Sequence, residues 1–376
     1  MTRRWTSAKY SVTVGLTAII VIGLYAYIFP RPGVNLEGGI SEKLYLDING
    51  HRHFVSVRGR SLEPILLFVH GGPGDPIGPH IAYYNAELFE HFLVVNYDQR
   101  GAGGSYQPTI DPATMTLDTL VKDLQGVVAY LRKRFHQPII LVGHSWGTFL
   151  GMHAAQQMSN QICGYVGIGQ VADQAASEQL SYDWVQDQAI NDASAKHELA
   201  KIDRPGHLGY KERLEDLYLQ RKWVREYGGA AFDKSNWQVL TMFALPILFY
   251  SDYTLAEKMQ YLTGETYSMN HLEHELFDQP LQAAKQTFDV PIIVIQGSHD
   301  RQTVTELTRA FYKNLRAPYK KYFEIEDAAH LVPMEKPQVF VQTLTRGVLD
   351  LLRSRRAEKV PNPCGTEQQL YEDPLS

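Results

Sequence analysis

Short, almost continuous apolar runs recur along most of the chain. Five of them have the length of strands: ILLFV (65–69), FLVVNYD (92–98), IILVG (139–143), PIIVIQG (291–297) and KYFEI (321–325). Parallel strands covered on both faces of a sheet have this nearly unbroken pattern. The runs therefore predict a parallel sheet that is buried on both sides.

Helical and antiparallel patterns complete this picture. Between two of the runs, residues 116–135 carry apolar side chains at spacings of three and four, which predicts an amphipathic helix. Before the first run, KLYLDI (43–48) and HFVSV (53–57) flank Asn49-Gly50, a dipeptide that favours a two-residue hairpin turn. Strand, helix and strand in alternation predict an α/β sheet that opens with an antiparallel pair.

The alternation stops near Gly169 and resumes at Val290. Residues 171–283 in between look helical and hold three of the five tryptophans. We therefore expect an α/β core formed by residues 41–170 and 284–355, with a helical cap at 171–283. Residues 356–376 form a polar tail with little apolar material to pack.

The first thirty residues differ from the rest. Residues 10–30 hold no charged side chain, a run long enough for a helix that crosses a hydrocarbon layer of about 30 Å. The basic residues Arg3, Arg4 and Lys9 precede it, which favours residues 1–9 in the cytoplasm and the catalytic domain outside it. We expect a single-pass membrane anchor, with a cleaved signal peptide as the rival interpretation.

Charge and cysteine content exclude some classes of protein. The 376 residues carry 36 Lys and Arg against 41 Asp and Glu, a net charge of −5 that argues against a nucleic-acid partner. Cys163 and Cys364 are too few for a disulfide scaffold, and the sequence leaves open whether they pair. The histidine pairs 51/53 and 271/274 lack completing ligands, so no metal site is expected.

The motif with the strongest chemical meaning is Gly143-His144-Ser145-Trp146-Gly147. It follows the run IILVG and precedes a helical pattern, which is the context of a nucleophile elbow. The two glycines allow a cramped turn where a larger Cβ would collide with neighbouring backbone. Ser145 is therefore the candidate nucleophile.

A serine nucleophile needs a base and an acid that orients the base, in the chain order Ser, acid, His on this fold. Asp300 follows the run PIIVIQG, and His330 follows KYFEI. The carboxyl ends of parallel strands meet at one edge of the sheet, so both are expected beside Ser145. Glu326 and Asp327 are competing acids in less suitable places.

A glycine loop, His70-Gly71-Gly72-Pro73-Gly74, follows the first apolar run. Its backbone amides can approach an oxyanion without side-chain interference, and we expect the amides of Gly72 and Trp146 to form the oxyanion hole. A second glycine cluster, residues 98–105 (DQRGAGGS), contains Arg and Gln, which makes a dinucleotide loop improbable there.

These three motifs together resemble the proline iminopeptidases, a family of α/β-hydrolases. HGGPG (70–74), DQRGAGGS (98–105) and GHSWG (143–147) carry the resemblance, which spans about residues 41–350. It implies the α/β-hydrolase fold, with Ser145 as nucleophile, Asp300 as acid, His330 as base and the helical insertion as a cap. It also implies that Asp98 and Arg100 brace the loops beneath the site.

Two departures from the family concern the substrate. Members commonly carry glycine where this chain has His144, and they use cap glutamates to hold the substrate's amine; Glu226 is the candidate match, but its spacing departs from that of the family. The second departure is the expected membrane anchor, because the better-known members are soluble and cytosolic. The resemblance favours an aminopeptidase that releases N-terminal proline or a similar residue and needs no cofactor. A membrane-associated esterase or lipid-directed hydrolase is the alternative, and a non-catalytic binding protein is the third hypothesis. The expected partner is thus a small peptide or ester, and the oligomeric state stays open.

Overall fold

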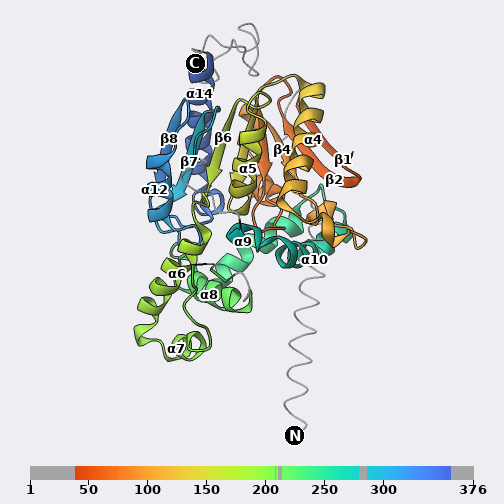
Figure 1. Ribbon diagram of the computed structural model, residues 1–376. Coiled ribbons are helices and arrows are strands. Elements are labelled where there is room, and N and C mark those ends of the chain that lie inside the picture. The colour runs from red at the N-terminus through yellow and green to blue at the C-terminus, as the bar shows by residue number, and fades with distance from the viewer. Residues whose placement is uncertain (1–38, 208, 211–213, 279–285, 357–376) are drawn as a thin grey trace.

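The computed structural model describes residues 39–207, 209–210, 214–278 and 286–356 (Figure 1). The predicted anchor at 10–30, nearly all of the predicted tail and Cys364 lie outside these ranges. Among the described residues, no helix has both the length and the apolar content needed to cross a bilayer.

Eight strands form one sheet in the order β1-β2-β4-β3-β5-β6-β7-β8. The antiparallel part consists of β1 (Ile40–Ile48), β2 (His51–Gly59) and the edge of β4 that faces β2. The remaining pairs are parallel and join β4 (Leu93–Tyr97), β3 (Ile65–Val69), β5 (Ile139–His144), β6 (Gly164–Ile168), β7 (Ile292–Gly297) and β8 (Lys320–Ile325). The predicted mostly parallel α/β sheet is confirmed.

Helices cover both faces of this sheet, which explains the unbroken apolar strands. One core cluster packs the sheet against α4 (Leu117–Phe135), α5 (Trp146–Gln157) and α12 (Thr305–Asn314). The opposite cluster involves α2 (Gly78–Tyr84), α3 (Leu88–His91), α13 (Val332–Glu335) and α14 (Pro337–Arg356). Short 3-10 turns at Gly103–Ser105 (η1) and Pro112–Thr114 (η2) lie between β4 and α4.

Two local predictions are confirmed in detail. Asn49 and Gly50 both have positive φ, 51° and 72°, as the tight turn between β1 and β2 requires. Helix α4 begins after Thr116, whose side chain caps it by accepting a hydrogen bond from the Thr119 amide.

The described helices between β6 and β7 occupy the segment expected to form the cap. They are α6 (Gln174–Gln188), α7 (Ala193–Leu199), α8 (Leu214–Glu226), α9 (Asn236–Phe249), α10 (Leu255–Leu272) and α11 (Glu275–Asp278), with a 3-10 turn, η3 (Ala189–Asn191). A separate apolar cluster joins α6, α7 and α8. Figure 1 shows these three helices protruding from the core, while α9 and α10 lie close against it.

Candidate active site

Ser145 lies in the sharp turn between β5 and α5. Its backbone has φ 53° and ψ −123°, a conformation that costs a non-glycine residue on the order of 1–3 kcal/mol. The Ser145 amide donates to the Ile168 carbonyl at 3.0 Å, and its carbonyl accepts from the Thr148 amide at 2.7 Å. Strand β6 and helix α5 thus hold the strained turn on either side.

Gly143 and Gly147 are required because a Cβ at either position would collide with neighbouring backbone, as the sequence predicted. A Cβ on Gly143 would lie 2.5 Å from the Gly147 carbonyl oxygen. A Cβ on Gly147 would lie 1.9 Å from the Val69 carbonyl oxygen. Backbone atoms cannot move aside as a flexible side chain can, so the turn requires glycine at both positions.

Asp300 and His330 form a buried pair beyond the ends of β7 and β8. His330 Nδ1 lies 2.8 Å from Asp300 Oδ2, and both side chains are almost fully buried. Gly169, the residue after β6, packs against them: a Cβ there would lie 3.0 Å from His330 Cε1. The structure therefore brings the predicted acid and base together at the sheet edge where β5 ends, next to Ser145.

Asp300 is held by more donors than His330 alone. Its Oδ1 accepts the amides of Gln302 and Thr303 at 2.8 and 2.9 Å. Its Oδ2 accepts from Thr303 Oγ1 at 2.7 Å and from Gln296 Nε2 at 3.0 Å. Burial alone would raise the pKa of Asp300, but the His330 charge and these hydrogen bonds hold it below its ordinary value. The carboxylate stays ionised without exposure to water.

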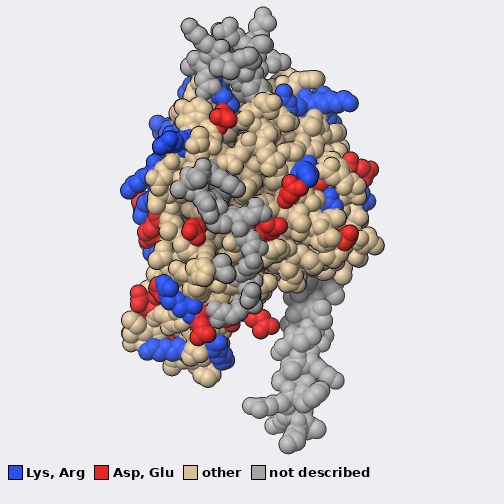
Figure 2. Space-filling view, viewed as in Figure 1, with Lys and Arg blue, Asp and Glu red and all other residues tan. Residues whose placement is uncertain are grey.

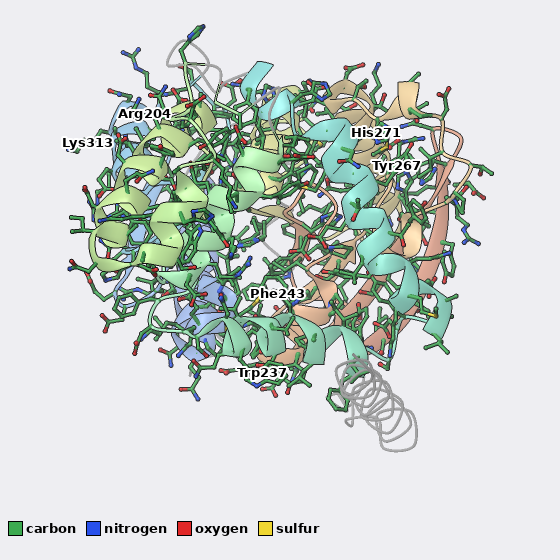
Figure 3. All side chains as sticks on the ribbon, turned by 90° about the horizontal axis from the view of Figure 1, so that it is seen from below. Arg204, Trp237, Phe243, Tyr267, His271 and Lys313 are labelled. Carbon is green, nitrogen blue, oxygen red and sulfur yellow. The ribbon has the colours of Figure 1, made fainter. Side chains whose placement is uncertain are left out.

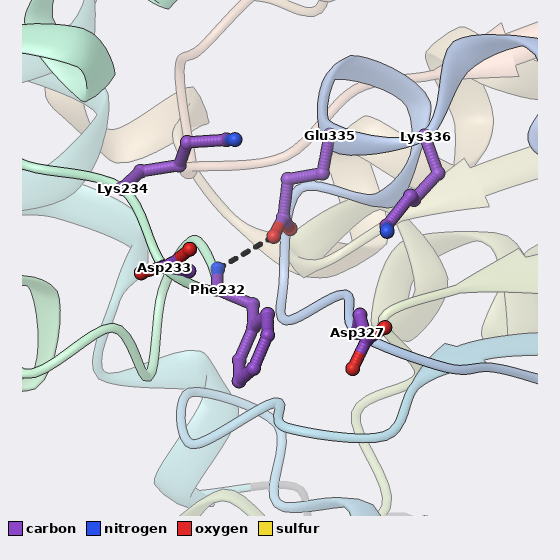
Figure 4. A pocket seen from close by; sticks show the side chains of 6 residues that line it. All are labelled: Phe232, Asp233, Lys234, Asp327, Glu335 and Lys336. Atoms are coloured by element: carbon purple, nitrogen blue, oxygen red, sulfur yellow. Dashed lines mark hydrogen bonds between the residues drawn. The ribbon is translucent and has the colours of Figure 1, made fainter.

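The loop that carries His330 is fixed by Glu335. Glu335 accepts hydrogen bonds from the amides of Ala329 and Leu331, at 3.1 and 2.9 Å, and from the amide of Phe232 in the α8–α9 segment. Glu335 also borders a surface pocket of about 240 Å³ (Figure 4), lined by Phe232, Asp233, Lys234, Asp327, Glu335 and Lys336. One carboxylate therefore ties the base's loop to the cap.

His144 supports the same loop from the other side. Its Nε2 lies 3.1 Å from the His330 carbonyl oxygen, which can only accept, so Nε2 carries the proton. Burial and then the His330 charge lower the pKa of His144 to about 3. A neutral imidazole therefore occupies the position where the resembling family commonly has glycine.

The predicted oxyanion loop lies directly against the nucleophile. A Cβ on Gly71 would be 3.1 Å from Ser145 Cβ. Gly72 has φ 104°, and a Cβ there would lie 2.5 Å from the Gly74 nitrogen. Trp146 begins α5, where the first amides of a helix have no intrahelical acceptor and attract negative charge.

Gln99 joins this loop to the nucleophile turn, a connection that the sequence did not reveal. Its Oε1 accepts from Trp146 Nε1 at 2.9 Å, and its Nε2 donates to the His70 carbonyl at 2.8 Å. The Gln99 amide also donates to His70 Nε2 at 2.9 Å, so His70 is neutral and carries its proton on Nδ1. Burial accordingly lowers the pKa of His70 to about 4.

The neighbours of Gln99 fix the rest of this segment. Arg100 donates two hydrogen bonds to Asp123 on α4, at 2.8 and 3.1 Å. Asp98 accepts from the Gly104 amide at 2.8 Å and from the Tyr253 hydroxyl. These contacts lie in the core and hold the loop's backbone in place.

A pair of acids lies between the glycine loop and the cap. Asp75 directly follows HGGPG, and burial raises its pKa to about 6, partly offset by Tyr261 and the nearby His330 charge. Burial and then the Asp75 charge raise the pKa of Glu265, on α10, to about 7. A Cβ on Gly74 would lie 2.9 Å from Glu265 Cα, so the loop and α10 are in contact here.

Tyr261, on α10, is hydrogen-bonded to the segment that carries Asp75. Its hydroxyl contacts both Asp75 Oδ1 and the Pro76 carbonyl, the latter at 3.0 Å. One hydroxyl has one proton and cannot donate fully to two acceptors. The hydrogen bond from Tyr261 to the Asp75 carboxylate favours its ionised form, so it lowers the Asp75 pKa and partly offsets the effect of burial.

Glu226, the cap acid suggested by sequence, is exposed at the end of α8. Its charge acts on the neighbouring Tyr227, whereas that of Asp75 acts on Glu265. The position of Asp75 next to HGGPG was a signal in the sequence that we did not use. No group of residues suited to a metal ion occurs in the described part of the chain.

Comparisons with known proteins identify the family and the relatives of this chain. The family model of the alpha/beta hydrolase fold matches residues 64–337. A probable aminopeptidase of Bacillus subtilis (strain 168), YbaC, is 30% identical over 304 residues, which cover 80% of this chain and 94% of that protein. A proline iminopeptidase of Levilactobacillus brevis is 32% identical over 110 residues, 29% of this chain and 36% of that protein.

A solved structure with the same fold extends the comparison beyond sequence similarity. The proline iminopeptidase of Mycobacterium smegmatis superimposes with a TM-score of 0.62 at 17% identity, covering 84% of this chain and all of that one. Since the family model spans most of the chain, the protein belongs to the α/β-hydrolase family, among the proline iminopeptidase-related hydrolases.

Proposed function

We propose that this chain is a serine aminopeptidase that releases a small N-terminal residue such as proline from peptides. The observation that carries the proposal is the half-buried acid pair Asp75 and Glu265, at the contact of the glycine loop with α10 and near the Asp300–His330 pair. A hydrolase that acts on neutral esters has no need for two carboxyl groups whose burial is costly. A substrate ammonium supplies the charge that makes them favourable.

The proposed reaction follows the serine hydrolase sequence. His330 takes the Ser145 proton as the serine oxygen attacks the carbonyl carbon, and Asp300 stabilises the imidazolium through Nδ1. The oxyanion is bound by the amides of Gly72 and Trp146. The leaving amine takes the proton from His330, and water then hydrolyses the acyl-enzyme by the reverse proton path. All of these groups belong to the chain itself.

The proposed ammonium site follows from the pKa values of the acid pair. At rest the pair holds a proton, because burial raises the pKa of both acids and the Asp75 charge raises that of Glu265 further. A substrate ammonium between Glu265 and Asp75 favours loss of that proton, because it pairs with the carboxylate charge that the loss creates. A substrate with a blocked amine cannot do this.

The test compares three substrates on one preparation: prolyl-naphthylamide, its N-acetylated form and a short-chain p-nitrophenyl ester. Loss of a buried charge partner costs about 2–5 kcal/mol, so acetylation should lower kcat/KM about 30-fold or more. Glu265→Gln should reproduce this loss, and Glu226→Gln is the matched control on an exposed acid. Equal turnover of both amides, or activity on the ester alone, contradicts the proposal and favours the esterase.

The role of Ser145 is tested separately. A fluorophosphonate probe labels an activated serine and should label the native chain but not the Ser145→Ala variant. An active enzyme that the probe leaves unlabelled would contradict the assignment.

We further propose that residues 10–30 anchor the enzyme in a membrane with the catalytic domain outside the cytoplasm. The support is the uncharged 21-residue run and the basic residues before it. Protease protection in sealed vesicles tests the orientation. A mature chain that begins after Ala26 or Pro30 would instead identify a cleaved signal peptide.

A further inference from the structure

Helix α9 has an unusual composition for its place in the molecule. Its sequence, NWQVLTMFALPILF, contains no charged residue, yet only Val239 and Pro246 in it are buried. A helix at a protein surface normally presents a polar outer face, and one that is apolar all round is normally inside a core. Helix α9 therefore exposes apolar surface, which is unfavourable in contact with water.

The start of α10 extends this apolar surface. Leu255, Met259 and Leu262 are 76%, 72% and 69% exposed, and their spacing of four and three places them on one face of α10. On α9, Trp237 and Leu240 are 71% and 56% exposed. We call these five residues the apolar patch.

The figures show the setting of the apolar patch. Seen from below in Figure 3, α9 and α10 follow one another around the rim of the face at a steep angle, with Trp237 on the outer side of α9 and Phe243 toward the middle. In Figure 2, charged side chains gather over the α6–α8 end and the outer edges, while the surface at the place of α10 is mostly without them.

The N-terminal strand enters the fold beside this patch. Ser41, at the start of β1, pairs with Arg58 on β2. Arg58 donates to Ser251 Oγ at 3.0 Å and forms an ion pair with Asp252, and these two residues connect α9 to α10. The chain that precedes Ile40 therefore leaves the domain next to the junction of the two helices.

A short linker limits how far the domain can lie from a membrane. Nine residues, 31–39, separate the uncharged run from β1. Even fully extended, they span about 30 Å at 3.3–3.6 Å per residue. If residues 10–30 cross the bilayer, the side of the domain that carries the α9–α10 junction must therefore stay close to the membrane surface.

We propose that the apolar patch inserts into the interfacial layer of the bilayer that holds the anchor. The inference rests on the proposed anchor but not on the proposed reaction. Tryptophan is enriched at this layer, and leucine and methionine side chains gain by leaving water there. Since α10 also carries Glu265, the ammonium site then lies beside the lipid surface, and peptides concentrated at that surface reach it first.

Brominated lipids test the contact directly, because bromine quenches tryptophan fluorescence at short range. The full chain is placed in phosphatidylcholine vesicles with plain or brominated acyl chains, and its emission is compared with that of Trp237→Phe. The difference between the two gives the Trp237 contribution, which should be lost in brominated vesicles. Trp184→Phe, on α6, is the matched control: the Trp184 emission, obtained by the same difference, should be unchanged in brominated vesicles.

A second pair of variants tests whether the patch itself makes the contact. Leu255→Glu combined with Met259→Glu should restore the Trp237 emission in brominated vesicles. Ile190→Glu, at a site 59% exposed in the turn η3, should leave the quenching as in the native chain. A thermal melt of each variant in detergent reports whether it has folded.

The outcomes separate the patch from the anchor. Unquenched Trp237 in a chain that stays with the vesicles after an alkaline wash overturns the patch proposal. If the wash removes the chain, the anchor proposal fails instead. The quenching test is then repeated after vesicles are added to the released protein. A dimer that the double glutamate variant dissociates, without quenching of Trp237, would assign the patch to a second copy of the chain and overturn the lipid contact.

Discussion

Replacing Asp300 by asparagine should inactivate the enzyme through the tautomer of His330. The backbone amides of Gln302 and Thr303 both donate to Asp300 Oδ1, so an asparagine must keep its carbonyl oxygen there. Its NH₂ group then takes the place of Oδ2 and faces donors from Gln296 and His330. Two donors cannot form a hydrogen bond with each other, so one of these groups must change.

The group that can change is His330. Gln296 cannot turn its amide, because its Oε1 already accepts from the Gln170 amide at 3.0 Å and its Nε2 donates to the Thr303 carbonyl at 2.8 Å. His330 can move its proton to Nε2 and accept from the new amide with Nδ1. Its Nε2 is then already protonated and can no longer accept the proton of Ser145.

The expected loss follows from this wrong tautomer. A change of this kind costs on the order of 10⁴-fold in kcat in a Ser-His-Asp site. At 1.36 kcal/mol per tenfold, this is about 5.5 kcal/mol of transition-state stabilisation. Stability should fall less, by about 1–3 kcal/mol, because one buried donor is left poorly paired. The measurements are the initial rate on prolyl-naphthylamide, with substrate saturation, and a thermal melt of the same sample.

Asp327→Asn is the matched control, since Asp327 lies in the same loop as His330 but is exposed. It has φ 52°, a conformation that asparagine tolerates well. It should retain nearly full activity. A folded Asp300→Asn enzyme that loses less than tenfold in kcat, or a comparable loss in the control, would refute the reasoning.

Three further predictions concern the support of the site. Glu335→Gln places an amide group against the backbone donors at Ala329 and Phe232. It should lower the free energy of unfolding by denaturant by about 1–3 kcal/mol and also lower kcat. A normal melt and a normal rate would contradict this. The ratio of kcat/KM for prolyl-naphthylamide to kcat/KM for the ester should rise from pH 5 to 8, because deprotonation of the Asp75–Glu265 pair creates the charge that binds ammonium. Glu265→Gln should flatten this rise. A ratio that does not change with pH in the native enzyme would exclude the pair as the ammonium site. Gly147→Ala should abolish folding or probe labelling, with Gly206→Ala, where a Cβ meets nothing within 4 Å, as the neutral control.

The sequence predicts the sheet well because its parallel strands are buried on both faces. Five apolar runs identify five of these strands, and chain order alone brings Asp300 and His330 to the edge where Ser145 lies. Strand β6 was not among the predicted strands. Its sequence, GYVGI, contains two glycines in five residues, which weakens the strand pattern, and its place is set by pairing with β5 and β7.

The acid pair could not be predicted from spacing. Asp75 and Glu265 are 190 positions apart, and only the packing of α10 on the glycine loop brings them together. Glu226 looked suitable because of its neighbours in sequence, yet the end of α8 leaves it exposed. Burial, which raises the pKa of the acid pair, is a property of the folded chain and leaves no local signal in the sequence.

The side chain of Gln99 has a consequence for how this family varies. It accepts a hydrogen bond from the Trp146 ring nitrogen and donates one to the His70 carbonyl. The three motifs HGGPG, DQRGAGGS and GHSWG therefore depend on one another. Replacement of Trp146 alone strands a buried Gln99 oxygen, and replacement of Gln99 alone strands the indole donor. Among related chains, we therefore expect positions 99 and 146 to change as a pair. An alignment of homologues in which they change independently would show that the connection is dispensable.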